Sequence, residues 1–407
     1  MLTRNALERT LIVAVGVGAG PLVQLLATPI LARIYQPSDF GHLALFLAIV
    51  GVLVTISCLR FEGAIAVVED ESVNTIAWVA LLSAMILFAA VLLLIAFEVP
   101  QAIFPAFAAL GDEVWGVPLV GVSGGVALVG SYLTLRQGRY LRNALIRSLP
   151  SVLFVAIAIG GSSIGLVRAN ILGALIVGCA VLGYLLVVIA PVSMKMLGPM
   201  AQRFRQYPLL LAPTSLLDAA AVTMPIFFIS AAYGLESTGH YTQIQRLIGA
   251  PMILAGVVVG QLFLKRSGEL FREGDSSKPL LWRCVGMLGL GALVMLLVLL
   301  LVGEPVCRAV LGQAWRVDTF FLILVTMPFL FKSVISPVST VFLTHGRVGL
   351  GVKWQVAYFV STISVLYIAS KYLSFDSFLI VYAIHEAILY LAYLAMANSV
   401  ASEPRHK

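Results

Sequence analysis

Three ionisable side chains of this sequence lie in the middle of long apolar segments. They are Asp218, Lys332 and Glu386, and His385 precedes the last of them. A charge at the centre of an apolar helix is expensive, so such groups usually line a polar interior, pair with an opposite charge or take up a proton. Each of the three is therefore a candidate for ligand binding or ion transfer.

Hydroxyl side chains accompany Lys332 on one face of its predicted helix. Ser336 and Thr340 follow it at intervals of about one helical turn. Pro328 and Pro337 interrupt the same segment and free backbone polar groups, which a cavity lined by protein can use. This pattern predicts the polar wall of a cavity.

The alternative for Lys332 is a buried ion pair with Asp218 that only fixes helix packing. A pair between Lys332 and one acid leaves the other acid without a cation. That acid must be protonated and hydrogen-bonded to a neighbouring helix, or it must hold a cation. Asp218 and Glu386 are therefore candidate sites for coupling to H+ or Na+. No other cofactor and no metal site is predicted, because the four cysteines are scattered.

Three arginines lie nearer the ends of apolar segments. Arginine suits phosphate because its planar fork donates two hydrogen bonds to one oxyanion. Arg33 and Arg60 could instead reach lipid headgroups, and Arg60 could pair with Glu62. Arg246 lies about one turn inside its segment, which favours a place in a polar interior.

The elements that must position these side chains are apolar helices. Hydrophobic residues make up 60% of the 407-residue chain and charged residues 11%, whereas a soluble domain carries roughly 25% charge. This composition excludes a soluble enzyme. A span needs about 20 apolar residues, and about 12 spans are predicted, at 11–34, 41–59, 75–97, 117–133, 150–166, 167–189, 208–232, 242–263, 280–302, 318–341, 348–370 and 378–397.

The distribution of cations predicts the orientation. Most of the 26 Lys and Arg residues fall in segments on the same side as the N-terminus, which predicts that both termini are cytoplasmic. The net charge of +7 thus indicates contact with the phospholipid bilayer and not with nucleic acid. Arg136, Arg139, Arg142 and Arg147 predict a cytoplasmic segment on the membrane surface or a topology signal.

Two short patterns occur twice. Residues 35–42 and 233–240 both begin with tyrosine and end with Gly-His, and Leu110-Gly111 with Trp115 matches Leu311-Gly312 with Trp315. The repeats predict an all-α polytopic membrane protein of two six-helix halves, 1–198 and 199–407. An even number of spans in each half makes the halves parallel repeats.

The chain resembles bacterial oligosaccharide flippases of the multidrug/oligosaccharidyl-lipid/polysaccharide export (MOP) superfamily. The resemblance extends over nearly the whole chain and rests on the order and spacing of several motifs. These are residues 31–41, 59–65 and 203–208, Gly239-His240-Tyr241 followed by Gln245-Arg246, and Leu311-Gly312 with Trp315.

The resemblance implies two six-helix bundles around a central cavity that opens alternately to each side. The implied substrate is an undecaprenyl-pyrophosphate-linked oligosaccharide, flipped to the periplasm for O-antigen (lipopolysaccharide) or exopolysaccharide assembly. Its pyrophosphate would bind Arg246, Lys332, Arg33 and Arg60, and no residue is expected to be catalytic. A polysaccharide polymerase and a chain-length regulator are the expected protein partners.

Two other functions stay open from the residues. A cation-coupled multidrug exporter of the same superfamily would share the fold, although span one holds no carboxylate. A membrane polysaccharide polymerase or glycosyltransferase would need a metal-binding acidic pair, for which only Asp112-Glu113 is available on the outer side.

Overall fold

The computed structural model describes residues 4–103 and 105–402. In these residues the regular structure is entirely helical. Ten of the helices are long and apolar enough to cross a membrane. The expected spans at 208–232 and 242–263 share one long helix. The expected first span, 11–34, lies in the helix Arg4–Ile34, of which Gly18–Ile34 is the described apolar part. The prediction of an all-α polytopic membrane protein is confirmed.

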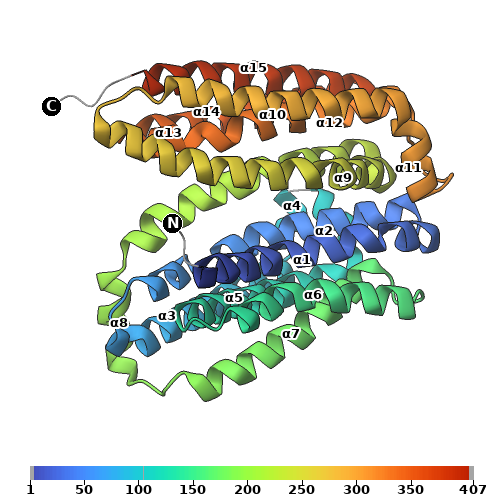
Figure 1. Cartoon of the computed structure of the whole chain (residues 1–407). Coiled ribbons are helices and arrows are strands. Elements are labelled where there is room, and N and C mark those ends of the chain that lie inside the picture. The colour runs from blue at the N-terminus through green and yellow to red at the C-terminus, as the bar shows by residue number, and fades with distance from the viewer. Residues whose placement is uncertain (1–3, 104, 403–407) are drawn as a thin grey trace. The chain divides into compact units, whose positions relative to one another are not determined.

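The chain divides into two compact units, and the boundary between them in the sequence follows Ala231. The first unit contains the helices that Figure 1 shows from blue to green. They are α1 (Arg4–Ile34), α2 (Pro37–Ile56), α3 (Val73–Ala96), α4 (Val99–Ile103), α5 (Gly116–Arg136), α6 (Tyr140–Gly160), α7 (Leu166–Val188) and α8 (Met194–Arg203), with short 3-10 helices at Phe61–Ala66, Asp70–Ser72 and Pro105–Trp115.

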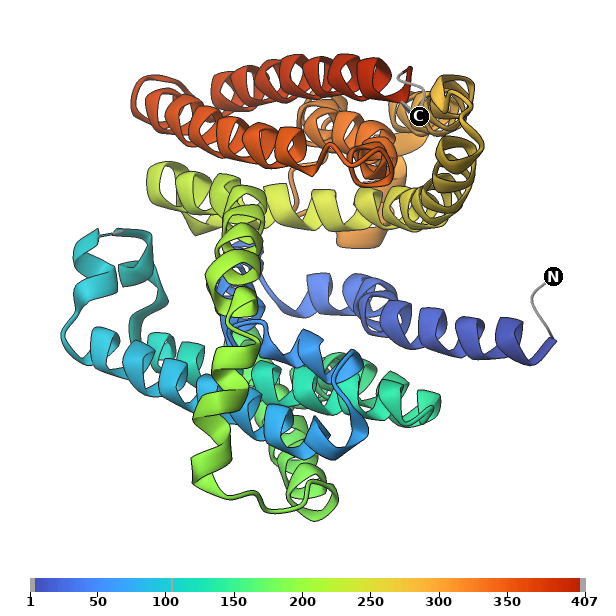
Figure 2. The same ribbon diagram turned by 90° about the vertical axis from the view of Figure 1, so that its left-hand side faces the viewer.

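The second unit begins inside the long helix α9 (Ala212–Glu273), which kinks at Gly234. In this unit α14 (Val348–Tyr372) and α15 (Phe375–Ala401) run side by side, as Figures 1 and 2 show. The expected boundary between residues 198 and 199 stays a prediction. The other elements are α10 (Lys278–Val298), α11 (Glu304–Leu311), α12 (Thr319–Ile335), α13 (Val341–Thr344), α14 (Val348–Tyr372) and α15 (Phe375–Ala401), with a 3-10 helix at Ser336–Thr340 and a π-helical turn at Leu299–Gly303. A second π-helical turn, at Tyr207–Leu211, precedes α9 in the first unit.

The predicted start of the fifth span, at residue 150, was wrong by about three helical turns. That span is α6, which begins at Tyr140 and already contains Arg142 and Arg147. Asn143 is buried and donates to the backbone oxygen of Ser131 at 2.7 Å, while Arg147 Nε donates to Ser131 Oγ at 2.8 Å. Because α5 satisfies these polar groups, the helix starts before the apolar run does. The arginine run is therefore not a separate surface segment.

The same tertiary contact occurs in both units. The Tyr35 hydroxyl donates to the carbonyl oxygen of Ala158 near the end of α6, at 2.8 Å. The Tyr233 hydroxyl donates to the carbonyl oxygen of Leu373 just after α14, at 3.0 Å. Each tyrosine precedes the Gly-His pattern by a few residues. The repeated sequence pattern therefore corresponds to a repeated structural contact.

Indole side chains give a second repeated contact. Trp78 near the start of α3 donates from Nε1 to the carbonyl oxygen of Ala190 just after α7, at 3.1 Å. Trp282 near the start of α10 donates from Nε1 to Oδ1 of Asn398 near the end of α15, at 3.0 Å. In each unit the start of one span is thus held to the end of a later span.

Close packing of α6 and α7 depends on Gly173. A Cβ atom at Gly173 would lie 2.9 Å from the backbone nitrogen of Phe154 and 3.2 Å from the carbonyl oxygen of Pro150. Backbone atoms cannot move aside as a flexible side chain can. Small residues at such contacts let membrane helices approach closely.

Gly173→Ala should therefore lower the free energy of unfolding by about 1–3 kcal/mol, the usual cost of overpacking. Unfolding of the purified protein in detergent, followed by circular dichroism, measures the effect. Gly183→Ala on the same helix is the control, because a Cβ there meets nothing within 4 Å. Equal stability of the two variants would contradict the packing argument.

Candidate functional site

Two helices of the second unit, α9 and α12, approach each other through glycines of α9. A Cβ at Gly249 would lie 3.1 Å from Cζ of Phe329. Further along, Cβ atoms at Gly256 and Gly260 would lie 3.3 and 3.4 Å from Pro337. Residue numbers rise in the same direction along both helices, so this contact is parallel. Pro337 follows the end of α12 at the point where the glycines leave room for its ring.

Arg246 and Lys332 flank this contact. Arg246 lies one turn before Gly249 on α9, and Lys332 lies one turn after Phe329 on α12. Residues three apart share a helix face, so both cations belong to the faces that meet there. Their positions differ by roughly six residues along the parallel axes, or about 9 Å. The structure therefore places two of the predicted binding residues beside the same helix contact.

The surroundings of Arg246 leave its guanidinium open to a ligand. The side chain is half-buried. In the part of the chain that the structure describes, no carboxylate lies within ion-pair distance of Arg246. A guanidinium presents five N–H donors, and leaving them without a partner in an apolar segment is costly. An anionic ligand would satisfy several of these donors at once.

The Glu386 carboxyl is enclosed within the second unit. Its side chain is 1% exposed and accepts hydrogen bonds from the hydroxyl of Tyr358, which lies 3.1 Å from each carboxyl oxygen. Tyr382 and Tyr390, one turn before and after it on α15, are buried as well. Buried Tyr241 of α9 completes the surroundings. A carboxylate with this little exposure needs a proton or a nearby cation.

His385 is the nearest group that could supply that proton or charge. Its Nδ1 lies 3.7 Å from Oε1 of Glu386, and its Nε2 lies 2.8 Å from the hydroxyl oxygen of Ser361 on α14. The imidazole thus lies between the Glu386 carboxyl on α15 and the Ser361 hydroxyl on α14.

Asp218 has surroundings unlike those of Glu386. It lies on the part of α9 that belongs to the first unit, and its side chain is exposed. The expected buried pair with Lys332 would join the two units and stays a prediction. Of the two candidate coupling acids, Glu386 is the one that the structure encloses.

Arg33 and Arg60 are far apart in the first unit. Arg33 is exposed at the end of α1, and its guanidinium donates to the carbonyl oxygen of Pro29 at 2.6 Å. Arg60 follows the other end of α2, a helix of 20 residues, or about 30 Å. Its guanidinium lies 3.7 Å from the Glu62 carboxyl, so the local pair considered from the sequence is formed. The two arginines thus lie near opposite ends of α2.

The tyrosines around Glu386 are functional candidates that the sequence reasoning missed. Tyr382, Glu386 and Tyr390 follow each other at four-residue intervals, which places them on one face of a helix. That spacing could have identified Tyr382 and Tyr390 from the sequence. Tyr358 could not be identified in this way, because only the packing of α14 against α15 brings its hydroxyl to the Glu386 carboxyl.

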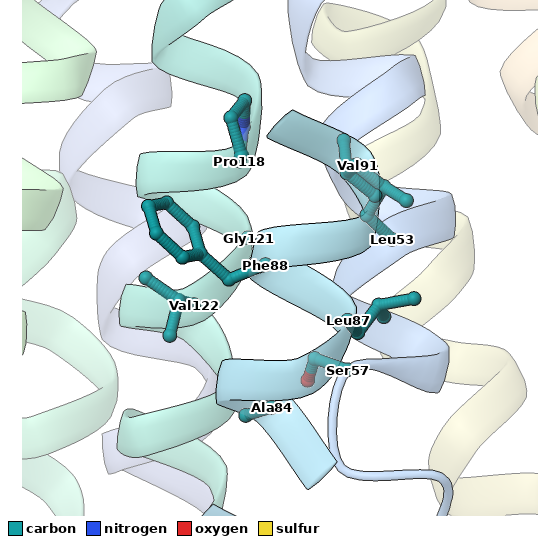
Figure 3. A pocket seen from close by; sticks show the side chains of 9 residues that line it. All are labelled: Leu53, Ser57, Ala84, Leu87, Phe88, Val91, Pro118, Gly121 and Val122. Atoms are coloured by element: carbon teal, nitrogen blue, oxygen red, sulfur yellow. The ribbon is translucent and has the colours of Figure 1, made fainter. Parts of the chain in front are cut away.

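A small pocket lies among α2, α3 and α5 of the first unit. Figure 3 shows its apolar lining, with Phe88, Leu53 and Val122 around Gly121 and with the Ser57 hydroxyl at one side. Its volume is about 10 Å³, room for roughly one water molecule. A sugar or a pyrophosphate does not fit there. The described residues also contain no group of His, Cys, Asp and Glu that could hold a metal ion.

The helical fold is similar to that of solved membrane transporters. The chain is similar to an inward-facing multidrug resistance MATE family transporter of this superfamily, with 15% identity, a TM-score of 0.71 and coverage of 97% of this chain and 98% of that chain. It is also similar to the MATE multidrug transporter DinF-BH in a ligand complex, with 12% identity, a TM-score of 0.64 and coverage of 96% and 94%. At these identities the likeness shows the fold.

The family is shown by the sequence itself. The family model described as polysaccharide biosynthesis protein matches residues 30–318, and no curated protein matches the chain. The chain belongs to this polysaccharide biosynthesis protein family. The membership and the fold confirm the family resemblance that the sequence motifs indicate.

Proposed function

We propose that this protein translocates a pyrophosphate-linked oligosaccharide, carried on an undecaprenyl lipid, across the bacterial inner membrane by alternating access. The observation that carries the proposal is the half-buried Arg246 guanidinium, which no carboxylate of the described residues neutralises and which lies across the α9–α12 contact from Lys332. Two cations about 9 Å apart along the helix axes match a ligand with two adjacent phosphates. The lipid tail can stay in the bilayer while the headgroup crosses.

The biology of the family supports this substrate class. The matching model describes polysaccharide biosynthesis, and lipid-linked repeat units for O-antigen or exopolysaccharide are substrates of that chemistry. In the proposed orientation both termini are cytoplasmic, as the cation distribution indicates. Arg60 would then meet the headgroup on the cytoplasmic side and Arg33 on the periplasmic side. A polymerase and a chain-length regulator would act on the flipped product.

A cation-coupled multidrug exporter is the second candidate. The two solved structures compared above are multidrug transporters, one of them in a ligand complex. The enclosed Glu386 carboxyl also suits ion coupling. The third candidate, a metal-dependent glycosyltransferase, has less support, because Glu113 of its acidic pair already contacts Arg168 at 3.1 Å and lies 3.4 Å from His42.

A deletion strain tests the proposal. Lipid-linked repeat units should accumulate in the inner leaflet, and surface polysaccharide should fall severalfold; a plasmid with the wild-type gene should restore both. A panel of cationic drugs is tested on the same strain. Normal polysaccharide in a strain without a second flippase contradicts the proposal, and increased drug sensitivity with normal polysaccharide supports the exporter.

A further inference from the structure

Glu62 is a buried acid in a segment that packs inside the first unit without spanning it. The 3-10 helix Phe61–Ala66 lies between the spans α2 and α3 and contacts both α3 and α5. The Glu62 side chain is 2% exposed, and its Oε2 is buried without a hydrogen-bond partner. Its other oxygen, Oε1, lies 3.7 Å from the Arg60 guanidinium, which is 36% exposed. The Arg60 side chain is thus partly in contact with water, whereas the Glu62 carboxyl with which it pairs is not.

The backbone holds Arg60 in an unusual conformation. Leu59 and Arg60 have φ angles of 50° and 66°, and both lie in the left-handed region that L-residues with side chains avoid. Such conformations persist only where the surroundings impose them, and they cluster at functional sites. Here Phe61, Ala64 and Ile65 are buried in the core of the unit and anchor the segment. The Arg60 side chain is therefore presented from a fixed point at the end of α2.

Titratable groups from several elements of the first unit lie near Glu62. Cys58 precedes it at the end of α2, and burial raises the pKa of that thiol so that it stays neutral. Arg136 from α5 donates to the carbonyl oxygen of Ile65 but is engaged by Asp70 at 2.6 Å. The ring of Tyr207 lies 3.3 Å from the place that a Cβ atom on Gly63 would take. Arg60 is the cation that the structure places on the Glu62 carboxyl.

We propose that Glu62 is a proton-controlled positioning residue for Arg60. An ionised Glu62 holds the guanidinium in the ion pair, and a proton taken from water onto the carboxyl releases Arg60 to bind the anionic headgroup of the substrate. The inference rests on the proposed function, because it assumes that Arg60 meets a phosphate. It adds a control step to that site at the end of α2.

The direction of the pH effect follows from burial. Burial raises the pKa of the Glu62 carboxyl above its ordinary value, and this effect outweighs the opposing ones of backbone hydrogen bonding and the Arg60 guanidinium. A raised pKa means that the carboxyl takes up its proton at a higher pH than an exposed glutamate. Lowering the pH therefore releases Arg60, and raising it restores the pair.

The first arm of the test observes the carboxyl without substrate. Infrared difference spectra of the purified full-length protein between about pH 8 and about pH 5 should show a protonated carboxyl band that Glu62→Gln removes. Arg60→Gln should move the midpoint of this band to higher pH, because the cation that favours the ionised form is gone. A band that is insensitive to Arg60→Gln overturns the inference.

The second arm measures binding of undecaprenyl pyrophosphate to the same protein in nanodiscs. Wild-type affinity, taken relative to Glu62→Gln to cancel titration of the ligand, should rise about tenfold from pH 8 to pH 5, the effect of one charge-assisted contact. Glu62→Gln should bind tightly at every pH and Arg60→Gln weakly at every pH. Wild-type and Glu62→Gln affinities with equal pH profiles overturn the inference and leave the function standing. Absence of binding by the wild type at every pH overturns the proposed function.

Discussion

Arg246→Gln should reduce translocation of the lipid-linked oligosaccharide by about 100-fold. Removing one partner of a desolvated charge contact costs roughly 2–5 kcal/mol, and 100-fold corresponds to about 2.7 kcal/mol. Glutamine keeps hydrogen-bonding capacity and much of the length of arginine, so the change mainly removes the charge. Because Arg246 has no carboxylate partner among the described residues, its loss strands no acid in the helix.

Lys332→Gln should have a smaller effect, since a lysine makes a single-point contact with phosphate where arginine makes two. The double variant should show no detectable translocation. Non-additivity is expected if both cations hold one pyrophosphate, because residues that share a partner do not act independently.

Translocation of a labelled lipid-linked oligosaccharide in vesicles with the purified protein measures these effects. Arg272→Gln on the same helix is the matched control, because Arg272 is exposed and donates to the Gly268 carbonyl oxygen at 3.2 Å. Thermal unfolding in detergent confirms that each variant is folded. Wild-type rates in the folded double variant would remove the basis of the proposed site.

Glu386→Gln should abolish the response of translocation to an ion gradient and lower the driven rate by about tenfold, if one proton or cation at this acid carries the coupling. Glutamine has the size of glutamate and can still accept a hydrogen bond from Tyr358. It cannot take up or release a proton and does not attract a cation. The change therefore separates the chemistry of the carboxyl from its packing.

The response is measured by imposing a proton gradient and a sodium gradient separately on the same vesicles. Tyr358→Phe is the structural control: it keeps the acid but removes the hydroxyl donor 3.1 Å away. It should lower the free energy of unfolding by about 1–3 kcal/mol while a gradient response remains. Asp218→Asn tests the other candidate acid. An unchanged gradient response in folded Glu386→Gln assigns Glu386 a purely structural role.

Most of the helical architecture was predictable from the sequence because crossing a bilayer is nearly a one-dimensional requirement. A run of about 20 apolar residues can only be a helix there, since every backbone polar group must be satisfied within the segment. The exception was α6, where Asn143 and Arg147 make the start of the helix look polar. Ser131 on a neighbouring helix accepts their hydrogen bonds, and a scan of apolar residues cannot register a partner from another helix.

The candidate site was predictable only in part, and the two acids show why. The sequence by itself determined that Asp218 and Glu386 lie in apolar helices and that Arg246 and Lys332 accompany them. Packing decided that Glu386 is enclosed and bonded by Tyr358 while Asp218 is exposed. Packing also placed Arg246 and Lys332 on two sides of one glycine contact. Hydropathy depends on neighbours along the chain, whereas burial and hydrogen bonding depend on neighbours in space, which only the tertiary structure supplies.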